Sequence, residues 1–82
     1  MLIYVGNLSD RTMNDELRPL FEAYGTVTSV NILRDVKTGT SKGFGFVDMP
    51  DKKQAKTAIE NLNGTILNGR RMGVNEARPD RD

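Results

Sequence analysis

Three aromatic residues, Tyr4, Phe44 and Phe46, are the side chains of this 82-residue sequence best suited to contact a ligand. Phe44 and Phe46 alternate with Gly43 and Gly45, so that small residues flank both rings. Rings that point into water cost free energy, and they are common on surfaces that stack the flat bases of nucleic acids. The spacing therefore predicts a stacking surface rather than a site that breaks bonds.

Residue types that carry out catalysis or bind metals are scarce. The sequence has no cysteine and no histidine, which removes disulfides, thiolate metal sites, the commonest general base and the commonest metal ligand. Gly43 and Gly45 do not form a phosphate-binding loop, because the GxxxxGK(S/T) pattern is absent and no helix follows them. We expect no enzymatic activity, no metal site and no cofactor.

The charge balance limits how strongly the chain can attract a polyanion. Twelve Lys and Arg residues against eleven Asp and Glu residues give a formal net charge of +1, so nucleic-acid affinity must come from local placement of cations. Basic residues gather around one loop and near the C-terminus, at Arg34, Lys37, Lys42, Arg70, Arg71, Arg78 and Arg81. A solvated surface of mixed charge explains them equally well.

Hydropathy indicates an intracellular protein. No apolar run reaches the eighteen or so residues that span a bilayer, and the N-terminal residues lack the basic stretch of a signal peptide. The absence of cysteine fits a reducing compartment. We therefore expect a cytoplasmic chain with no membrane partner.

The elements that position the rings follow from apolar periodicity, which predicts the order βαββαβ. Strands are expected at residues 2–5, 30–33 and 43–49, and helices at 12–24 and 51–62. A hairpin with an Asn68-Gly69 turn joins 65–67 to 72–74, and its second arm is the expected fourth strand. This order predicts an α+β fold, a ferredoxin-like sandwich with a four-stranded antiparallel sheet and two helices on one face.

Local signals mark the ends of both helices and of the domain. Thr12 precedes Asp15 by three residues in a pattern like a capping box, and Asp51 precedes Gln54 in the same way. Pro19 lies inside the first helix, where it removes a hydrogen bond and is expected to bend the helix. Residues 1–77 are expected to form one domain, and 78–82 a mobile tail.

Alternation of side chains across a strand decides which face carries the rings. In the third strand, Phe44 and Phe46 point one way while Val47 and Met49 point the other. Val47 and Met49 suit a core, so the phenylalanines are expected on the face away from the helices. The same alternation sends Tyr4 outward, where it joins them if the first and third strands are neighbours.

Two segments resemble the motifs of the RNA-recognition-motif family. Residues 3–8, Ile-Tyr-Val-Gly-Asn-Leu, resemble its ribonucleoprotein hexamer, and residues 42–49 resemble its octamer, K/R-G-F/Y-G/A-F-V-x-F/Y. Met49 is the one departure from the octamer, and its predicted place in the core makes it a matter of packing. The resemblance spans about residues 2–77, and the chain looks like small bacterial or organellar RNA-binding proteins with one such domain.

The resemblance implies a role for each candidate residue. Tyr4 and Phe46 would each stack a base, Phe44 would pack against riboses, and Lys42 would meet a phosphate. The other candidate RNA contacts are Asn31, Leu33, Arg34, Lys37, Asn75, Glu76, Ala77 and Arg78. Gly73 lies where many relatives carry a longer side chain, so the fourth strand offers one contact fewer.

The expected function is non-catalytic binding of single-stranded RNA by a monomer, in RNA metabolism or post-transcriptional regulation. Single-stranded DNA stays open as a ligand, since only contacts to the 2′-hydroxyl distinguish RNA from it. A protein-interaction module with the same fold also stays open. An enzyme with this element order is disfavoured because no activated nucleophile is visible.

Overall fold

The computed structural model describes residues 1–77 of the chain. The elements in chain order are β1 (Leu2–Gly6), α1 (Asn14–Glu22), β2 (Ser29–Arg34), β3 (Ser41–Asp48), α2 (Lys52–Leu62), β4 (Ile66–Leu67), β5 (Arg70–Arg71) and β6 (Gly73–Glu76). The predicted α+β order is confirmed, with the short β4–β5 hairpin inserted before the last strand. The predicted tail, 78–82, and the candidate contact Arg78 lie outside the described residues.

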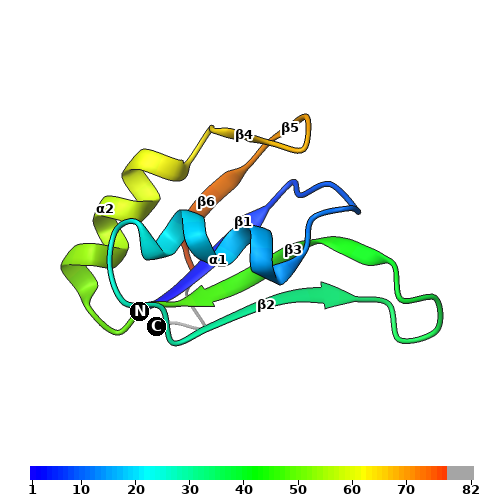
Figure 1. The fold of residues 1–82 in the computed structure, drawn as a ribbon, viewed down its shortest axis with the longest axis horizontal. Coiled ribbons are helices and arrows are strands. Elements are labelled where there is room, and N and C mark those ends of the chain that lie inside the picture. The colour runs from blue at the N-terminus through cyan, green and yellow to red at the C-terminus, as the bar shows by residue number, and fades with distance from the viewer. Residues whose placement is uncertain (78–82) are drawn as a thin grey trace.

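The main sheet has four antiparallel strands in the order β2-β3-β1-β6. The first and third strands are therefore neighbours, as the predicted cluster of rings requires. Helices α1 and α2 cover one face of this sheet, and no helix within residues 1–77 lies on the other (Figure 1). The order places the two ribonucleoprotein-like motifs on the two central strands.

The core lies between the sheet and the helices. Ile3, Val5 and Val47 from the strands and Leu17 and Phe21 from α1 are fully buried there. Each such side chain stabilises the fold by about 1.5 to 3 kcal/mol. Helix α2 adds small residues, Ala55 and Ala58, which let its backbone approach the sheet closely.

Helix α1 begins later than predicted. Its N-cap is Met13, whose backbone N–H donates to Oε1 of Glu16 over 2.9 Å, so the predicted start at Thr12 with Asp15 is wrong by one residue. The physical reason is that Thr12 is fully buried, where its hydroxyl accepts a hydrogen bond of 3.1 Å from Nδ2 of Asn68. Thr12 is used to hold the hairpin rather than to cap the helix.

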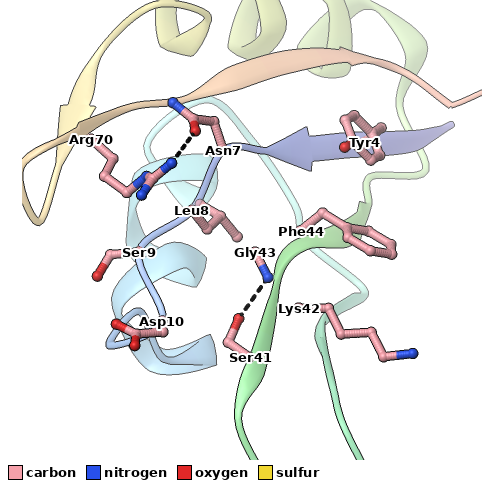
Figure 2. Close-up of a pocket in the computed structure, with 10 residues that line it drawn as sticks. All are labelled: Tyr4, Asn7, Leu8, Ser9, Asp10, Ser41, Lys42, Gly43, Phe44 and Arg70. Atoms are coloured by element: carbon pink, nitrogen blue, oxygen red, sulfur yellow. Dashed lines mark hydrogen bonds between the residues drawn. The ribbon is translucent and has the colours of Figure 1, made fainter.

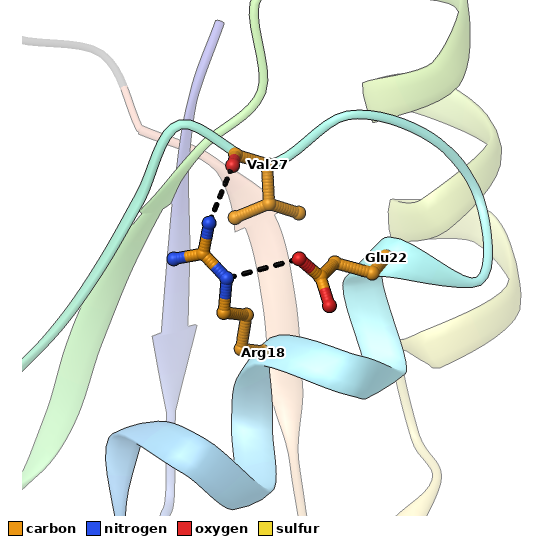
Figure 3. Close-up of polar contacts among 3 residues, drawn as sticks. All are labelled: Arg18, Glu22 and Val27. Carbon is orange, nitrogen blue, oxygen red and sulfur yellow. Dashed lines mark hydrogen bonds and ion pairs between the residues drawn. The ribbon is translucent and has the colours of Figure 1, made fainter.

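Pro19 does not end α1, which continues to Glu22. Pro19 is exposed, and so is Asp15, whose carbonyl has no N–H partner at the proline, so the missing hydrogen bond falls on an exposed part of the helix. Arg18, the residue before the proline, ties the helix to the following loop. Its guanidinium donates to the Val27 carbonyl over 2.9 Å and pairs with the Glu22 carboxylate over 2.9 Å (Figure 3).

The start of α2 agrees with the sequence prediction. Oδ1 of Asp51 accepts hydrogen bonds from the backbone N–H groups of Lys53 and Gln54, over 2.9 and 3.0 Å. The Gln54 side chain does not complete a capping box. Its Oε1 accepts from the Thr26 N–H over 3.0 Å and so joins α2 to the loop after α1.

The fourth strand of the sheet is not the second arm of the hairpin, which corrects the prediction. The Asn68-Gly69 turn joins β4 to β5, while β6 is a separate strand that pairs with β1. Met72 lies between β5 and β6, with its side chain buried in the core and its backbone N–H still donating to the Thr65 carbonyl over 2.8 Å. The chain leaves the hairpin at this residue and enters the main sheet.

Within residues 1–77, no helix has the length and apolar character needed to cross a membrane.

Candidate nucleic-acid interface

The three rings lie on the uncovered face of the sheet, as side-chain alternation predicted. Tyr4 is 37% exposed, whereas its neighbours Ile3 and Val5 are fully buried. Phe44 and Phe46 are half-buried on the same face. Met49, the departure from the octamer pattern, is fully buried in the core, which confirms that it concerns packing.

The rings form one cluster in which each contacts the other two. Tyr4 lies 5.9 Å from Phe44 and 5.9 Å from Phe46 between ring centroids, with interplanar angles of 31° and 66°. The Phe44 and Phe46 centroids are 6.1 Å apart and the rings are perpendicular. These separations are typical of favourable aromatic pairs. Because the planes differ, the cluster offers several stacking surfaces rather than one flat one.

Two asparagines extend the ring cluster into a row across all four strands. In the register of the sheet, Phe46 is the partner of Asn31 on β2 and of Tyr4 on β1, and Tyr4 is the partner of Asn75 on β6. At a strand spacing of about 4.8 Å, the row is roughly 14 Å long. Both asparagines are exposed, so their amide donors and acceptors are available at its two ends.

Glycines near the rings serve different purposes. A Cβ on Gly6 would lie 2.6 Å from Oη of Tyr4. The absence of a side chain at Gly6 therefore keeps free the space that the tyrosine ring occupies. A Cβ on Gly45 would meet the Asn31 carbonyl oxygen of β2 at 2.6 Å, on the other side of the strand from the rings. Gly45 therefore permits close pairing of β2 and β3, and Gly6 makes room for the Tyr4 ring.

An open cleft of about 560 Å³ adjoins the rings (Figure 2). Tyr4 and Phe44 line it on the side of the sheet, and the loop after β1 lines it on the other. Lys42 also lines this cleft and extends in the same direction as Phe44 (Figure 2). The predicted phosphate contact thus lies next to the predicted stacking surface.

Two other predicted cations do not lie beside the rings. The Arg34 guanidinium turns to the helix side of the sheet, where Nη2 lies 3.4 Å from the Thr12 carbonyl oxygen and 3.5 Å from Sδ of Met13. Lys37 lies in the loop that extends past the ends of β2 and β3 (Figure 1). Arg34 follows Ile32 on the same face, and Ile32 is buried, so strand alternation accounts for its orientation.

The remaining candidates lie along the edges of the open face. Leu33 is half-buried on β2, next to a register shift between Ile32 and Arg34. Glu76 is exposed, and its partner in the register of the sheet is buried Ile3. The main chain of Glu76, rather than its side chain, therefore lies near the open face. The backbone N–H of Ala77 already donates to the Leu2 carbonyl over 2.8 Å.

Arg70 and Asn7 are site residues that the sequence prediction missed. Nη2 of Arg70 donates to Oδ1 of Asn7 over 2.7 Å, and Nδ2 of Asn7 donates to the Arg71 carbonyl over 2.7 Å. The Asn68-Gly69 turn indicated a hairpin but not where it would dock. More than sixty residues separate the partners in sequence, so no local pattern could place Arg70 at the cleft.

Comparison with known proteins identifies the family pattern over most of the chain. The family model described as RNA recognition motif matches residues 3–73. RbpA of Nostoc sp. is 45% identical over 82 residues, which cover 100% of this chain and 80% of RbpA. A glycine-rich RNA-binding protein of Daucus carota is 43% identical over 75 residues, which cover 92% of this chain and 48% of that protein.

Solved structures share the same fold. The crystal structure of RNA binding protein PG1 superposes with a TM-score of 0.91 at 45% identity, covering 100% of this chain and 98% of that one. The Sxl-lethal protein/RNA complex superposes with a TM-score of 0.92 at 36% identity, covering 99% of this chain and 48% of that one. The arrangement of helices and strands is therefore that of RNA recognition domains.

Proposed function

The chain belongs to the RNA-recognition-motif family, and we propose from this premise that it binds single-stranded RNA on the open face of its sheet. The family is in general non-catalytic. The observation that carries the proposal is the cluster of Tyr4, Phe44 and Phe46 on the sheet face that no helix covers. The similarity to a glycine-rich RNA-binding protein and to a protein/RNA complex supports RNA as the ligand.

In this proposal, two neighbouring bases stack on Tyr4 and Phe46, and Phe44 packs against the riboses between them. Tyr4 contacts Phe44 and Phe46, and these contacts hold the rings in place before RNA binds. Little side-chain conformational entropy is therefore lost on binding. One stacked base contributes about 1 to 3 kcal/mol. Stacking alone accepts every base, because every base has a flat face.

Selection among bases falls to the polar groups that surround the rings. Asn31 and Asn75 lie at the two ends of the row and can donate to and accept from base edges. Lys42 is proposed to meet a phosphate without reading the sequence. Gly73 lies on the same strand as Asn75 and has no side chain. The fourth strand of the sheet therefore has few groups that could select one base over another. We propose a binding domain of residues 1–77 with modest sequence preference, acting in RNA metabolism.

Alanine substitutions of the rings test this proposal. Tyr4→Ala and Phe46→Ala are each expected to weaken binding by about 1 to 3 kcal/mol, because each removes one stacking surface. Binding is measured by titration with a labelled pool of random single-stranded RNA of about eight nucleotides, a length within the usual range of such sites.

Matched variants separate stacking from folding. Tyr4→Phe and Phe46→Tyr keep a ring at each position and are expected to retain most of the affinity, while circular dichroism checks the fold of all four variants. Alanine variants that fold and bind RNA as tightly as the wild-type chain would contradict the stacking proposal.

A further inference from the structure

The cleft beside the rings contains a cation that stacking does not use. Arg70 lies on β5, and its guanidinium reaches the cleft that Tyr4, Phe44 and Lys42 also line (Figure 2). The neighbouring Arg71 does not line this cleft, and its Nη1 donates instead to the Gly64 carbonyl over 2.9 Å. Two adjacent arginines of one hairpin thus have different surroundings.

Asn7 holds Arg70 in place. The asparagine has a φ of 56°, a left-handed conformation that asparagine adopts more readily than most residues. Its amide accepts from Arg70 on one side and donates to the Arg71 backbone on the other, each over 2.7 Å. Both amide atoms face the hairpin, so the guanidinium is oriented before any ligand arrives.

The positive charge of Arg70 is not compensated by this contact. Asn7 is neutral, and among residues 1–77 no carboxylate oxygen lies within 4.0 Å of Arg70 or of Lys42. Of the described residues that line the cleft, Asp10 alone is acidic, so Lys42 and Arg70 give this lining a positive balance. A guanidinium that uses one N–H group on Asn7 keeps the others for a ligand.

The cleft is continuous with the stacking surface, since Tyr4 and Phe44 line both. A nucleotide stacked on Tyr4 therefore has the sugar-phosphate chain leading from it within reach of the cleft. Paired donors on a planar guanidinium match the oxygens of a phosphate group.

We propose that this cleft binds the backbone phosphate next to the stacked nucleotides, with Arg70 as its main contact and Asn7 as the residue that positions it. The inference rests on the proposed function and extends the site from the sheet to the β4–β5 hairpin. The ligand at this position is a phosphodiester of single-stranded RNA, and the contact does not depend on base identity.

Charge removal at two adjacent arginines tests the proposal. Arg70→Gln is compared with Arg71→Gln in the full chain, by titration with the same random RNA pool between about 50 and 200 mM salt. Arg70→Gln is expected to raise Kd by about three- to tenfold at the low-salt end and to reduce the slope of log affinity against log salt by about 0.7. Arg71→Gln, which removes an equal charge outside the cleft, is expected to change the slope by much less.

Two further measurements define the contact. Arg70→Lys keeps the charge and is expected to retain the wild-type slope. In the second measurement, the random RNA pool is shortened by one nucleotide. An abasic nucleotide, which adds a phosphate without a base, is then attached at the 5′ end or at the 3′ end. One of these extensions is expected to restore affinity for the wild-type chain and not for Arg70→Gln.

The outcomes separate this inference from the proposed function. If Arg70→Gln and Arg71→Gln changed RNA affinity and its salt dependence equally, or if neither changed them, the proposed phosphate contact would be overturned. Loss of binding by Phe46→Ala in the same assay would still support the stacking proposal. A wild-type chain that bound no pool would overturn both. Circular dichroism on both glutamine variants confirms that the comparison is between folded proteins.

Discussion

At the scale of single residues, the position of the Tyr4 ring depends on a residue that has no side chain. The Tyr4 ring lies over Gly6, where an added Cβ would be 2.6 Å from its Oη atom. Gly73 is the partner of Gly6 on the neighbouring strand, yet a Cβ added there would meet no atom within 4 Å. The two glycines face each other across β1 and β6 and differ only in what surrounds them.

This contrast supports a prediction about Gly6. Gly6→Ala is expected to displace the Tyr4 ring and to weaken RNA binding by up to the roughly 1 to 3 kcal/mol of one stacked base. The clash falls on the end of a flexible side chain, so the fold is expected to remain. The measurement is RNA titration together with the NMR shifts of the Tyr4 ring protons.

Gly73→Ala provides the control, because its added methyl group has free space. It is expected to leave the Tyr4 signals unchanged and to bind RNA as the wild-type chain does. If both alanine variants bound equally well, the position of the Tyr4 ring over Gly6 would not matter for binding.

At the scale of elements, side chains from outside the sheet hold its strands and helices together. Asn14, the first residue of α1, accepts the Ile32 N–H of edge strand β2 over 3.0 Å. An edge strand with free N–H groups invites pairing with another chain, and this contact occupies one of them. Asn63 does the same for β6, since its Oδ1 accepts the Val74 N–H over 2.9 Å.

Asp51 supports the most direct prediction at this scale. Its carboxylate accepts two backbone N–H groups at the start of α2, so Asp51→Ala is expected to lower the free energy of unfolding by about 1 kcal/mol. Urea denaturation followed by circular dichroism measures the change.

Asp51→Asn keeps a side-chain oxygen at the cap and is expected to retain most of this stability. RNA affinity should be the same in both variants at temperatures where both are folded, because α2 packs on the face of the sheet that carries buried Ile3 and Val5, opposite to Tyr4. An alanine variant as stable as the asparagine variant would show that the cap contributes nothing.

At the scale of the whole molecule, a formal net charge of +1 provides little long-range attraction to RNA. The cations proposed to contact the backbone are Lys42 and Arg70, which line one cleft. Arg34 points to the start of α1, and Lys37 lies beyond the end of the sheet. On this proposal, few cations are placed to contact phosphates, and most of the affinity would come from stacking.

This balance predicts weak binding with a shallow salt dependence. Two phosphate contacts at about −0.7 each correspond to a slope of about −1.4 in log affinity against log salt. We expect a Kd in the micromolar range or weaker, since the sheet accommodates only a few nucleotides. Titration of the random RNA pool at several salt concentrations measures both quantities.

A slope several times steeper would show phosphate contacts outside the cleft. A DNA pool of the same lengths, titrated in parallel, measures how much the 2′-hydroxyl contributes to affinity. Equal affinity for the two pools would favour the alternative that single-stranded DNA is also a ligand.

The sequence by itself determined the fold and the face of the sheet on which the three rings cluster. Alternation along β1 and β3 placed Tyr4, Phe44 and Phe46 on one face, and the apolar periodicity of the helices assigned them to the other. These features follow from local rules, because the period of a strand or helix depends only on near neighbours in the chain. The two ribonucleoprotein-like motifs identified the family on the same residues.

Only the tertiary structure decided which residues from other elements form the cleft beside the rings. Local patterns could not show that Thr12 would be buried against the hairpin, or that Met72 would lie between β5 and β6. Asn7 and Arg70 meet across more than sixty residues, through a hairpin whose docking site no local pattern specifies. Contacts of this kind depend on how packed elements meet. The face of each strand that carries the rings was therefore predictable from the sequence, whereas the cleft beside the rings was not.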